Sequence, residues 1–233
     1  GPGITHVISG IYNANSNAWP LLVLAGSASF DENHKGGFQE LDQVSFLTPH
    51  TKFAALPFHP LQVPRLLEQA YRWAIYGVPG TTYLDLPANI IQGNYDEDVE
   101  IITAINDIQP PPEAPKLQAD QSRVAIAAQE LSRAKRPLII VGKGAAYGNA
   151  SKQLEQLITK NRFPFLPTPM GKGVLPDDHE LNVSAARSLA ISTADVILVS
   201  GARLNWILHS GERFAPGVKI IQIDNNPGQI GFN

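Results

Sequence analysis

Small residues and single cations follow several apolar runs of this chain, a pattern that suits the binding of phosphate. Residues 142–144 (Gly-Lys-Gly) follow the run 137–141, and residues 201–203 (Gly-Ala-Arg) follow the run 196–200. Glycine lets backbone N–H groups approach a phosphate closely, and a lysine or arginine adds positive charge. The predicted ligand is therefore the polyphosphate of a nucleotide or of coenzyme A.

Two further groups of residues could contact the same kind of ligand. They are Ala186, Arg187 and Ser188 in one loop, and Asp224 at the end of the run 219–223. A guanidinium binds phosphate through paired hydrogen bonds, and an acid after a strand can accept from ribose hydroxyls. The alternatives are a surface arginine, a turn carboxylate and, for Lys143, a solvated lysine in a tight turn. Because Lys143, Arg203 and Asp224 all follow predicted strands, their shared position favours a site.

Residues 37–43 (Gly-Phe-Gln-Glu-Leu-Asp-Gln) form a different polar group. A glutamine amide both donates and accepts hydrogen bonds, so Gln39 beside Phe38 can orient a carbonyl or hydroxyl group of a substrate. The alternative is a helix over 38–46 with exposed polar residues at its start, which the spacing alone favours. The six histidines are scattered, with no close pair at metal-binding spacing, so a zinc site is not predicted.

The elements that must position these residues alternate between strands and helices. Strand-like apolar runs lie at 20–25, 51–55, 82–86, 137–141, 163–166, 196–199 and 219–223. Helices are predicted over 4–17, 60–76, 122–134, 150–161 and 185–191. We expect caps at Asp120 and Asn149, burial of 20–25 on both faces of a sheet, and Trp206 in the core. The alternation predicts an α/β fold of parallel sheets with helices on both faces.

Composition excludes several classes of protein. Lys and Arg number 18 and Asp and Glu number 21, which gives a net charge of −3. No basic stripe appears, so nucleic acid is not a predicted partner. No apolar run approaches the roughly 20 residues of a membrane helix. The absence of cysteine excludes disulfide scaffolds, thiolate metal sites and cysteine nucleophiles.

The chain divides near residues 93–118. The first part of this stretch is acidic. Its later part is rich in proline, above all at residues 110–115 (Pro-Pro-Pro-Glu-Ala-Pro). Prolines stiffen a tether and cannot donate hydrogen bonds to a sheet. We therefore predict domains over 1–92 and 119–233, joined by a linker over 93–118. Because the chain starts without methionine and stops directly after a predicted strand and turn, we expect a longer polypeptide.

The sequence resembles the thiamine-diphosphate-dependent enzymes of the acetolactate synthase and oxalyl-CoA decarboxylase superfamily, and within it the 2-hydroxyacyl-CoA lyase family. The segments that carry the resemblance are residues 1–3, 13–26, 37–40, 51–53, 83–87, 142–147, 163–173, 185–188 and 201–208. Those from 142 to 208 are specific to the two acyl-CoA branches. The oxalyl-CoA branch typically has tyrosine and glutamate where this chain has Phe38 and Gln39, so the lyase branch is favoured.

The resemblance implies two Rossmann-like domains, the first of them incomplete. Residues 1–92 would be the later part of the domain that binds the aminopyrimidine of the cofactor, and residues 119–233 most of a central domain that binds a nucleotide or coenzyme A. Phe38 and Gln39 would line the reaction site. The residues that match a coenzyme A contact loop are Ala186, Arg187 and Ser188, and those that match an ADP-binding pocket are Lys143, Arg203 and Asp224. Val78 departs from the family, since relatives usually have there an arginine that can contact ADP.

The implied reaction is the cleavage of 2-hydroxyacyl-CoA to formyl-CoA and a shortened aldehyde, a step of fatty acid α-oxidation, with thiamine diphosphate and Mg²⁺ as cofactors. In the family the activating glutamate and the Mg²⁺-diphosphate segment lie outside the part matched here. We therefore expect no metal ligands in this chain and no turnover by the chain alone. The resemblance also implies an acyl-CoA substrate, a homo-oligomer (dimer or tetramer), and a location in the peroxisome, or in the cytoplasm of a bacterium.

Two other functions stay open at this point. An oxalyl-CoA decarboxylase would act on a related thioester with the same cofactor. A catalytically silent nucleotide-binding relative would keep the central domain and lack the residues that bind the cofactor.

Overall fold

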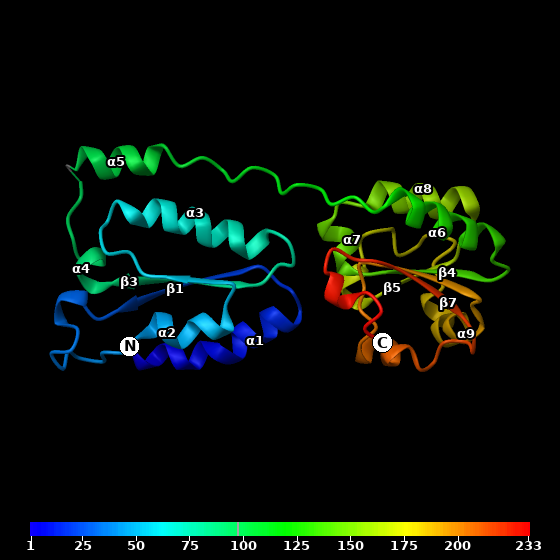
Figure 1. Cartoon of the computed structure of the whole chain (residues 1–233), viewed down its shortest axis with the longest axis horizontal. Helices are drawn as coiled ribbons and strands as arrows, with labels where there is room; N and C mark the ends of the chain where they lie inside the picture. Colours follow the sequence, from blue (N-terminus) through cyan, green and yellow to red (C-terminus); the bar gives the residue numbers. More distant parts are fainter. Residues whose placement is uncertain (97) are drawn as a thin grey trace. The chain divides into compact units, whose positions relative to one another are not determined.

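The computed structural model describes residues 1–96 and 98–233. The chain folds into two compact units, Gly1–Pro115 (unit 1) and Lys116–Asn233 (unit 2). Each unit is an α/β structure built on a parallel sheet, as the alternation of apolar runs predicts (Figure 1). The division between the units falls between Pro115 and Lys116, inside the stretch 93–118, which also contains a helix, α5 (Val99–Asn106).

Unit 1 contains a three-stranded sheet in the order β1-β3-β2. Its strands are β1 (Leu21–Ser27), β2 (Phe53–Ala55) and β3 (Thr81–Pro87). Its helices are α1 (Ile8–Ser16), α2 (Gln43–Leu47), α3 (Gln62–Ile75), α4 (Ala88–Ile91) and α5, with short 3-10 helices at Pro2–Val7, Phe30–Glu32 and Thr48–His50. Figure 1 shows α3 on one face of the sheet and α1 and α2 on the other.

The central strand β3 organises the packing of unit 1. On one face, Tyr83 is fully buried against Ile11 of α1 and Leu47 of α2. On the other face, the Thr82 hydroxyl donates a 3.0 Å hydrogen bond to the carbonyl oxygen of Ala70 in α3. Because successive side chains of a strand point to opposite faces, this strand holds both helical layers.

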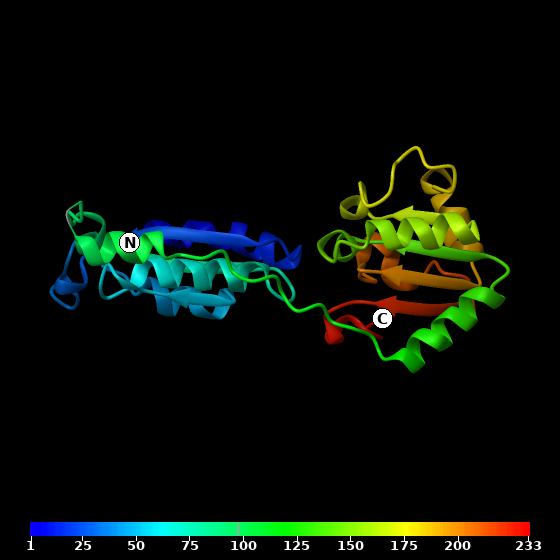
Figure 2. The same cartoon turned by 90° about the horizontal axis from the view of Figure 1, so that it is seen from above.

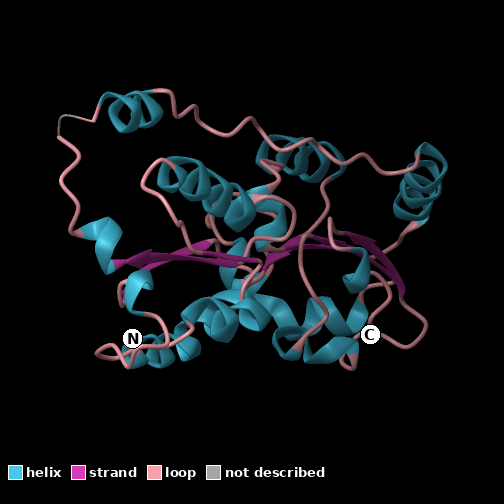
Figure 3. Cartoon of the chain, turned by 60° about the vertical axis from the view of Figure 1, so that its left-hand side comes forward, coloured by secondary structure: helices cyan, strands magenta, loops and turns pink. Residues whose placement is uncertain are grey.

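Unit 2 contains a four-stranded parallel sheet in the order β5-β4-β6-β7. Its strands are β4 (Pro137–Val141), β5 (Phe165–Pro167), β6 (Val196–Ser200) and β7 (Lys219–Ile223). Its helices are α6 (Gln121–Arg133), α7 (Lys143–Tyr147), α8 (Ser151–Asn161) and α9 (Arg187–Thr193), with 3-10 helices at Pro169–Gly171, Ser184–Ala186, Trp206–Gly211 and Pro227–Gln229. Figures 2 and 3 show these helices flanking the strands.

Two apolar clusters fill the two faces of the unit 2 sheet. One contains Ile139 of β4 and Ile158 of α8, and the other contains Ile140 of β4 and Ile191 of α9. All four side chains are at most 3% exposed. The unbroken apolar sequence of β4 is therefore explained by a strand with a helical layer on each side.

Most of the predicted elements are confirmed, and the differences have physical reasons. The Asp120 carboxylate caps α6 by accepting from Ser122 N at 2.7 Å. Asn149 does not cap α8, because it adopts a left-handed conformation (φ 50°) one residue too early. The prediction that 20–25 is buried on both faces is wrong, since β1 is an edge strand and Leu24 is 51% exposed. Among the described residues, none of the helices has the length and apolar character that crossing a membrane requires.

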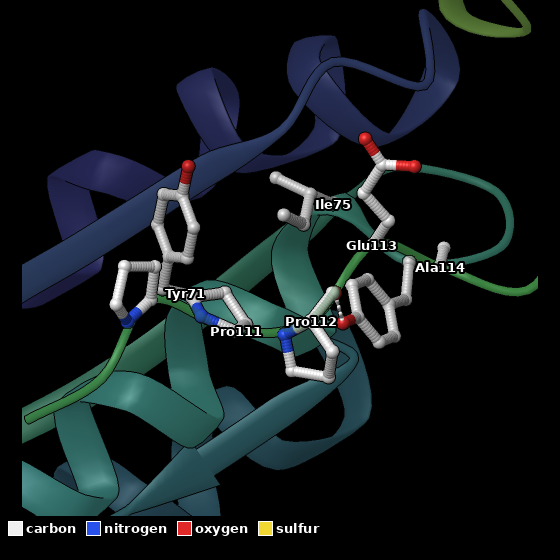
Figure 4. A pocket seen from close by; sticks show the side chains of 8 residues that line it. Tyr71, Ile75, Pro111, Pro112, Glu113 and Ala114 are labelled. Atoms are coloured by element: carbon white, nitrogen blue, oxygen red, sulfur yellow. Dashed lines mark hydrogen bonds between the residues drawn. The ribbon is translucent and has the colours of Figure 1, made fainter.

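The proline-rich segment of unit 1 lies against the end of α3. Pro111, Pro112 and Ala114 line an apolar cavity of about 510 Å³ together with Tyr71 and Ile75 (Figure 4). The hydroxyl of Tyr76, next to α3, donates to the carbonyl oxygen of Pro112. The sequence predicts a stiff linker here, and the structure shows in addition what the segment contacts.

We expect Tyr76→Phe to loosen this segment without unfolding the unit. The change removes one exposed hydrogen bond, worth about 0.5–1.5 kcal/mol, and keeps the aromatic ring. The rate of limited proteolysis within 107–118 should rise several-fold, while the melting temperature should fall by no more than a few degrees. Tyr71→Phe, which leaves the Tyr76 bond intact, is the control. Equal cleavage of the parent and Tyr76→Phe would contradict the assignment.

Candidate functional site

The strands of unit 2 end at the same level of the sheet. Val141 pairs with Ser200 and with Pro167, and Ser200 pairs with Ile223. The loops that follow these four strands therefore leave from one edge. Ligands of open parallel sheets bind beyond this carboxyl edge, so the topology brings the loops of Lys143, Arg203 and Asp224 to the same side of unit 2.

The glycines of these loops allow neighbouring loops to pack closely against one another. A Cβ on Gly142 would lie 2.2 Å from the carbonyl oxygen of Gly201, and a Cβ on Gly171 would lie 2.0 Å from that of Val141. The amide of Gly142 donates to Ser200 O at 2.8 Å, and that of Gly144 donates to Gly201 O at 2.9 Å. The prediction that these N–H groups face a phosphate is therefore wrong, because carbonyl groups of the neighbouring loop already use them.

Charge for an anion comes instead from side chains at this edge. Lys143 is the first residue of α7 and is partly buried. Its pKa is lowered to about 8, mainly by burial and further by the positive charge of Arg203. Lys143 and Arg203 follow β4 and β6, which pair directly and end at the same level of the sheet. Two like charges in a partly desolvated site are stabilised by an anion that lies between them.

The other predicted residues of unit 2 have different surroundings. Arg187, at the start of α9, donates from its guanidinium to the carbonyl oxygen of Ile207, while Ala186 and Ser188 are exposed. The Asp224 carboxylate accepts from Asn226 N at 2.8 Å, so it makes the turn contact of the alternative interpretation. Trp206 is 80% exposed, so the expectation that it lies in the core is wrong. Residues 184–188 and 206–207 are thus joined by Arg187.

In unit 1 the loop between β1 and α2 carries Phe38 and Gln39. The predicted helix over 38–46 is wrong in its first half, because α2 begins only at Gln43 with Asp42 as its cap. Phe38 is 86% exposed, and Gln39 has a left-handed backbone conformation with φ 56°. A non-glycine residue in this conformation costs roughly 1–2 kcal/mol, and six other non-glycine residues among those described also have a positive φ.

The carboxylate of Glu40 holds this loop in shape. Its Oε1 accepts from His34 N at 2.6 Å, and its Oε2 accepts from Gly37 N at 3.3 Å. The hydrogen bond from His34 is the largest cause of a lowered pKa for Glu40. Gln39 also lies against Gly1, where an added Cβ would come within 2.7 Å of Gln39 Cβ. The exposed Phe38 and Gln39 therefore sit on a loop of defined shape.

A buried polar cluster lies beneath the loop, and the sequence did not identify it. The Nε2 atom of Gln43 donates to Gly26 O at 3.2 Å, to Tyr83 Oη at 2.8 Å and to Asp85 Oδ1 at 3.2 Å. Its Oε1 accepts from Gly1 N. Gln43 is 1% exposed and Asp85 is 2% exposed. A carboxylate within the apolar run 82–86 was the signal that could have revealed the cluster.

Burial shifts the titration of the two ionisable members of the cluster. It raises the pKa of Asp85, and the neighbouring side chains of Ser27 and Gln43 lower that pKa in part. It also raises the pKa of Tyr83, as does the negative charge of Asp85. A polar cavity of about 150 Å³ adjoins the cluster. Its lining includes Ser27, His34, Glu40, Asp42, Gln43 and Asp85.

Val78 lies at the opposite, amino edge of the unit 1 sheet, in the turn between α3 and β3. Its carbonyl oxygen accepts from Lys52 Nζ at 2.7 Å, and its side chain is 38% exposed. Lys52 also donates to Tyr76 O at 2.8 Å, and burial lowers the pKa of Lys52. No group of three or more His, Cys, Asp or Glu that could hold a metal ion occurs among the residues that the structure describes.

Two family models match this chain. One, described as "Thiamine pyrophosphate enzyme, central domain", matches residues 124–233, which fall in unit 2. The other, described as "Thiamine pyrophosphate enzyme, N-terminal TPP binding domain", matches residues 1–46, which fall in unit 1 and include the Phe38–Gln39 loop.

Curated relatives match the chain along its whole length. Identity is 45% over 235 residues to 2-hydroxyacyl-CoA lyase 1 of Homo sapiens, covering 100% of this chain and 40% of the relative. It is 42% over 238 residues to 2-hydroxyacyl-CoA lyase of Saccharomyces cerevisiae, covering 100% and 42%. It is 38% over 235 residues to oxalyl-CoA decarboxylase of Escherichia coli (strain K12), covering 100% and 41%. The chain thus spans about 40% of the length of these relatives.

Proposed function

Because the chain belongs to the thiamine pyrophosphate enzymes, we propose that it forms part of a carbon–carbon lyase that cleaves 2-hydroxyacyl-CoA to formyl-CoA and a shortened aldehyde. The observation that carries the proposal is the similarity along the entire chain to proteins named 2-hydroxyacyl-CoA lyase, at 45% and 42% identity. The neutral Phe38–Gln39 pair supports it, since an amide suits a hydroxyacyl group better than a second carboxylate would.

The residues of unit 1 fit one part of thiamine diphosphate. The cavity at the carboxyl edge of its sheet is lined by hydroxyl and carboxylate groups, among them those of Ser27 and Asp42, which suit a ring that takes part in hydrogen bonds. By the family resemblance, Mg²⁺ and the diphosphate would be held elsewhere in the enzyme. When bound, the cofactor supplies the electron sink for cleavage of the C1–C2 bond.

Within this proposal, Phe38 and Gln39 orient the reacting end of the substrate. The exposed ring of Phe38 offers an apolar surface that excludes water, and the Gln39 amide donates to or accepts from the substrate hydroxyl. The hydrogen bonds of the Glu40 carboxylate fix the loop before the substrate binds, which lowers the entropy lost in orienting the substrate.

Unit 2 would bind the phosphates of coenzyme A or of a nucleotide such as ADP. Lys143 and Arg203 supply the charge, and Arg187, Ala186 and Ser188 form the loop proposed to contact coenzyme A. Lys143 is protonated at neutral pH, since its pKa of about 8 lies above 7. Asp224 keeps a free lone pair for a ribose hydroxyl after its contact with Asn226.

The family resemblance supports the remaining proposals. Residues 1–92 and 119–233 would act as the aminopyrimidine-binding and central domains, joined by 93–118. We also propose a dimer or tetramer, Mg²⁺ as second cofactor, and a role in fatty acid α-oxidation in the peroxisome, or in the cytoplasm of a bacterial cell.

The test is turnover by the full-length enzyme that contains this chain, supplied with thiamine diphosphate and Mg²⁺. With a 2-hydroxyacyl-CoA we expect formyl-CoA and an aldehyde in equal amounts, and kcat/KM at least tenfold above that for oxalyl-CoA. The 38% identity to oxalyl-CoA decarboxylase makes that activity the second candidate. A preference for oxalyl-CoA with release of carbon dioxide would replace the lyase by the decarboxylase. Nucleotide binding without any turnover would support the catalytically silent alternative.

A further inference from the structure

The side chain of Gln43 joins segments of unit 1 that are far apart in the sequence. It contacts Gly1, Gly26 near the end of β1, and Tyr83 and Asp85 in β3. Its three acceptors share the two N–H bonds of one amide group. Because Gln43 is only 1% exposed, these contacts replace the water that it gives up on folding.

Such an amide has no close substitute. A buried donor or acceptor that loses its partner costs about 1–3 kcal/mol, and networks in a low-dielectric interior depend on every member. A glutamate side chain differs from that of Gln43 only in having an oxygen in place of the NH₂ group, yet a carboxylate at this position would direct negative charge at the carbonyl of Gly26 and the carboxylate of Asp85. The contacts therefore specify glutamine and not merely a polar residue.

Gln43 also terminates the loop that carries Phe38 and Gln39. The loop leaves β1 after Ser27 and ends at Asp42, directly before Gln43. On its other side, Gln39 touches Gly1, which is itself hydrogen bonded to Gln43. The strained Gln39 backbone is thus held between the Glu40 carboxylate and a residue fixed by Gln43.

We propose that Gln43 is a positioning residue that sets the place of Phe38 and Gln39 through Gly1 and the end of the loop. It has no part in the chemistry itself, because it is buried under the loop. The inference rests on the proposed function, namely that Phe38 and Gln39 line the reaction site and that unit 2 binds the coenzyme A phosphates.

The decisive variant is Gln43→Glu in the full-length lyase. We expect kcat for 2-hydroxyacyl-CoA to fall about tenfold at pH 7.5, while KM changes less than about threefold, because the coenzyme A phosphates are held by unit 2. At pH 5.5 the ratio of variant to parent kcat should recover, since one proton shared by the introduced carboxylate and Asp85 restores a hydrogen bond. Besides Asp85, the titratable groups facing this position are Tyr83, with His34, Glu40 and Asp42 around the cavity.

A rescue and a control separate positioning from general damage. Combining Gln43→Glu with Asp85→Asn restores a hydrogen bond between the two positions, because the new amide at position 85 can donate to the new carboxylate. We therefore expect kcat at pH 7.5 to rise at least threefold above the single variant. Gln92→Glu adds the same charge at an exposed position of unit 1, and it should leave kcat unchanged at both pH values. Parent kcat in Gln43→Glu at pH 7.5, or a loss that neither acid nor Asp85→Asn reduces, would overturn the proposal.

Hydrogen exchange gives a readout that does not depend on turnover. In Gln43→Glu the amides of residues 34–40 should exchange at least tenfold faster than in the parent, while those of β6 in unit 2 stay the same. If the parent enzyme turns over no 2-hydroxyacyl-CoA, the proposed function fails and exchange alone decides this inference. Unchanged exchange at residues 34–40 would then reject it, and faster exchange would support it.

Discussion

Replacing Lys143 by alanine should lower the affinity of the protein for ADP or coenzyme A about ten- to hundredfold. A hydrogen bond to a charged group contributes about 1.5–3 kcal/mol, and the positive charge of Arg203 already lowers the pKa of Lys143. Calorimetry at pH 7 measures the change. Lys152→Ala, at an exposed position of α8, is the matched control and should bind like the parent. Equal affinity in both variants would remove Lys143 from the ligand site.

The pH dependence of binding gives a second check on Lys143. An anion binds the protonated amine, so affinity should fall by up to tenfold per pH unit as the pH rises above about 8. Lys143→Arg should flatten this fall, since arginine stays protonated. The folding stability changes in the opposite direction. Between pH 8 and 10.5 the unfolded chain binds more protons at this lysine than the folded protein does, because folding lowers the pKa of Lys143. The contribution of Lys143 to the free energy of unfolding therefore rises with pH. Loss of binding in this range would therefore not reflect loss of fold through Lys143.

Gly201→Ala should be among the most destabilising single changes in unit 2. Gly201 has φ 61°, and an added Cβ would lie 2.4 Å from Ala145 N and 2.6 Å from Gly144 C, both backbone atoms. Strain of about 1–2 kcal/mol and overpacking of about 1–3 kcal/mol combine to about 2–5 kcal/mol. That range is a large part of the roughly 5–15 kcal/mol that stabilises a domain. Urea unfolding measures the loss.

A matched glycine separates the two causes. Gly217 has φ 75° and nothing within 4 Å of an added Cβ, so Gly217→Ala should show only the strain of about 1–2 kcal/mol. Equal losses at the two positions would mean that the loops of Gly144 and Gly201 move apart at little cost, and would contradict the close packing seen at this edge of the sheet.

The positions of the two cations of unit 2 show how far the sequence reaches. Lys143 and Arg203 each follow an apolar run, and parallel strands place such residues at one edge. The paired strands β4 and β6 do end at the same level of the sheet, whereas a ligand site shared by the two cations stays a prediction. The orientation of the neighbouring N–H groups was not predictable, because it depends on which carbonyl of another loop each amide meets.

The polar cluster of unit 1 shows what sequence patterns do not predict. Gln43 is separated from Tyr83 and Asp85 by about 40 residues, and neither spacing nor periodicity relates a helix start to a distant strand. The prediction that Trp206 lies in the core is wrong for a similar reason. Burial of a large side chain depends on what packs above it, and in this fold its loop leaves it 80% exposed.

Local patterns of residues were enough to predict the α/β architecture and the strand ends that carry Lys143 and Arg203, because period and apolar content act over a few neighbouring residues. Folding in three dimensions was needed to establish that glycine amides bond loop to loop, that Gln39 is held in a left-handed turn, and that Gln43 joins Gly1 to two strands. These features depend on close contacts between segments distant in the chain, where a single Cβ or NH₂ group determines whether the backbone fits.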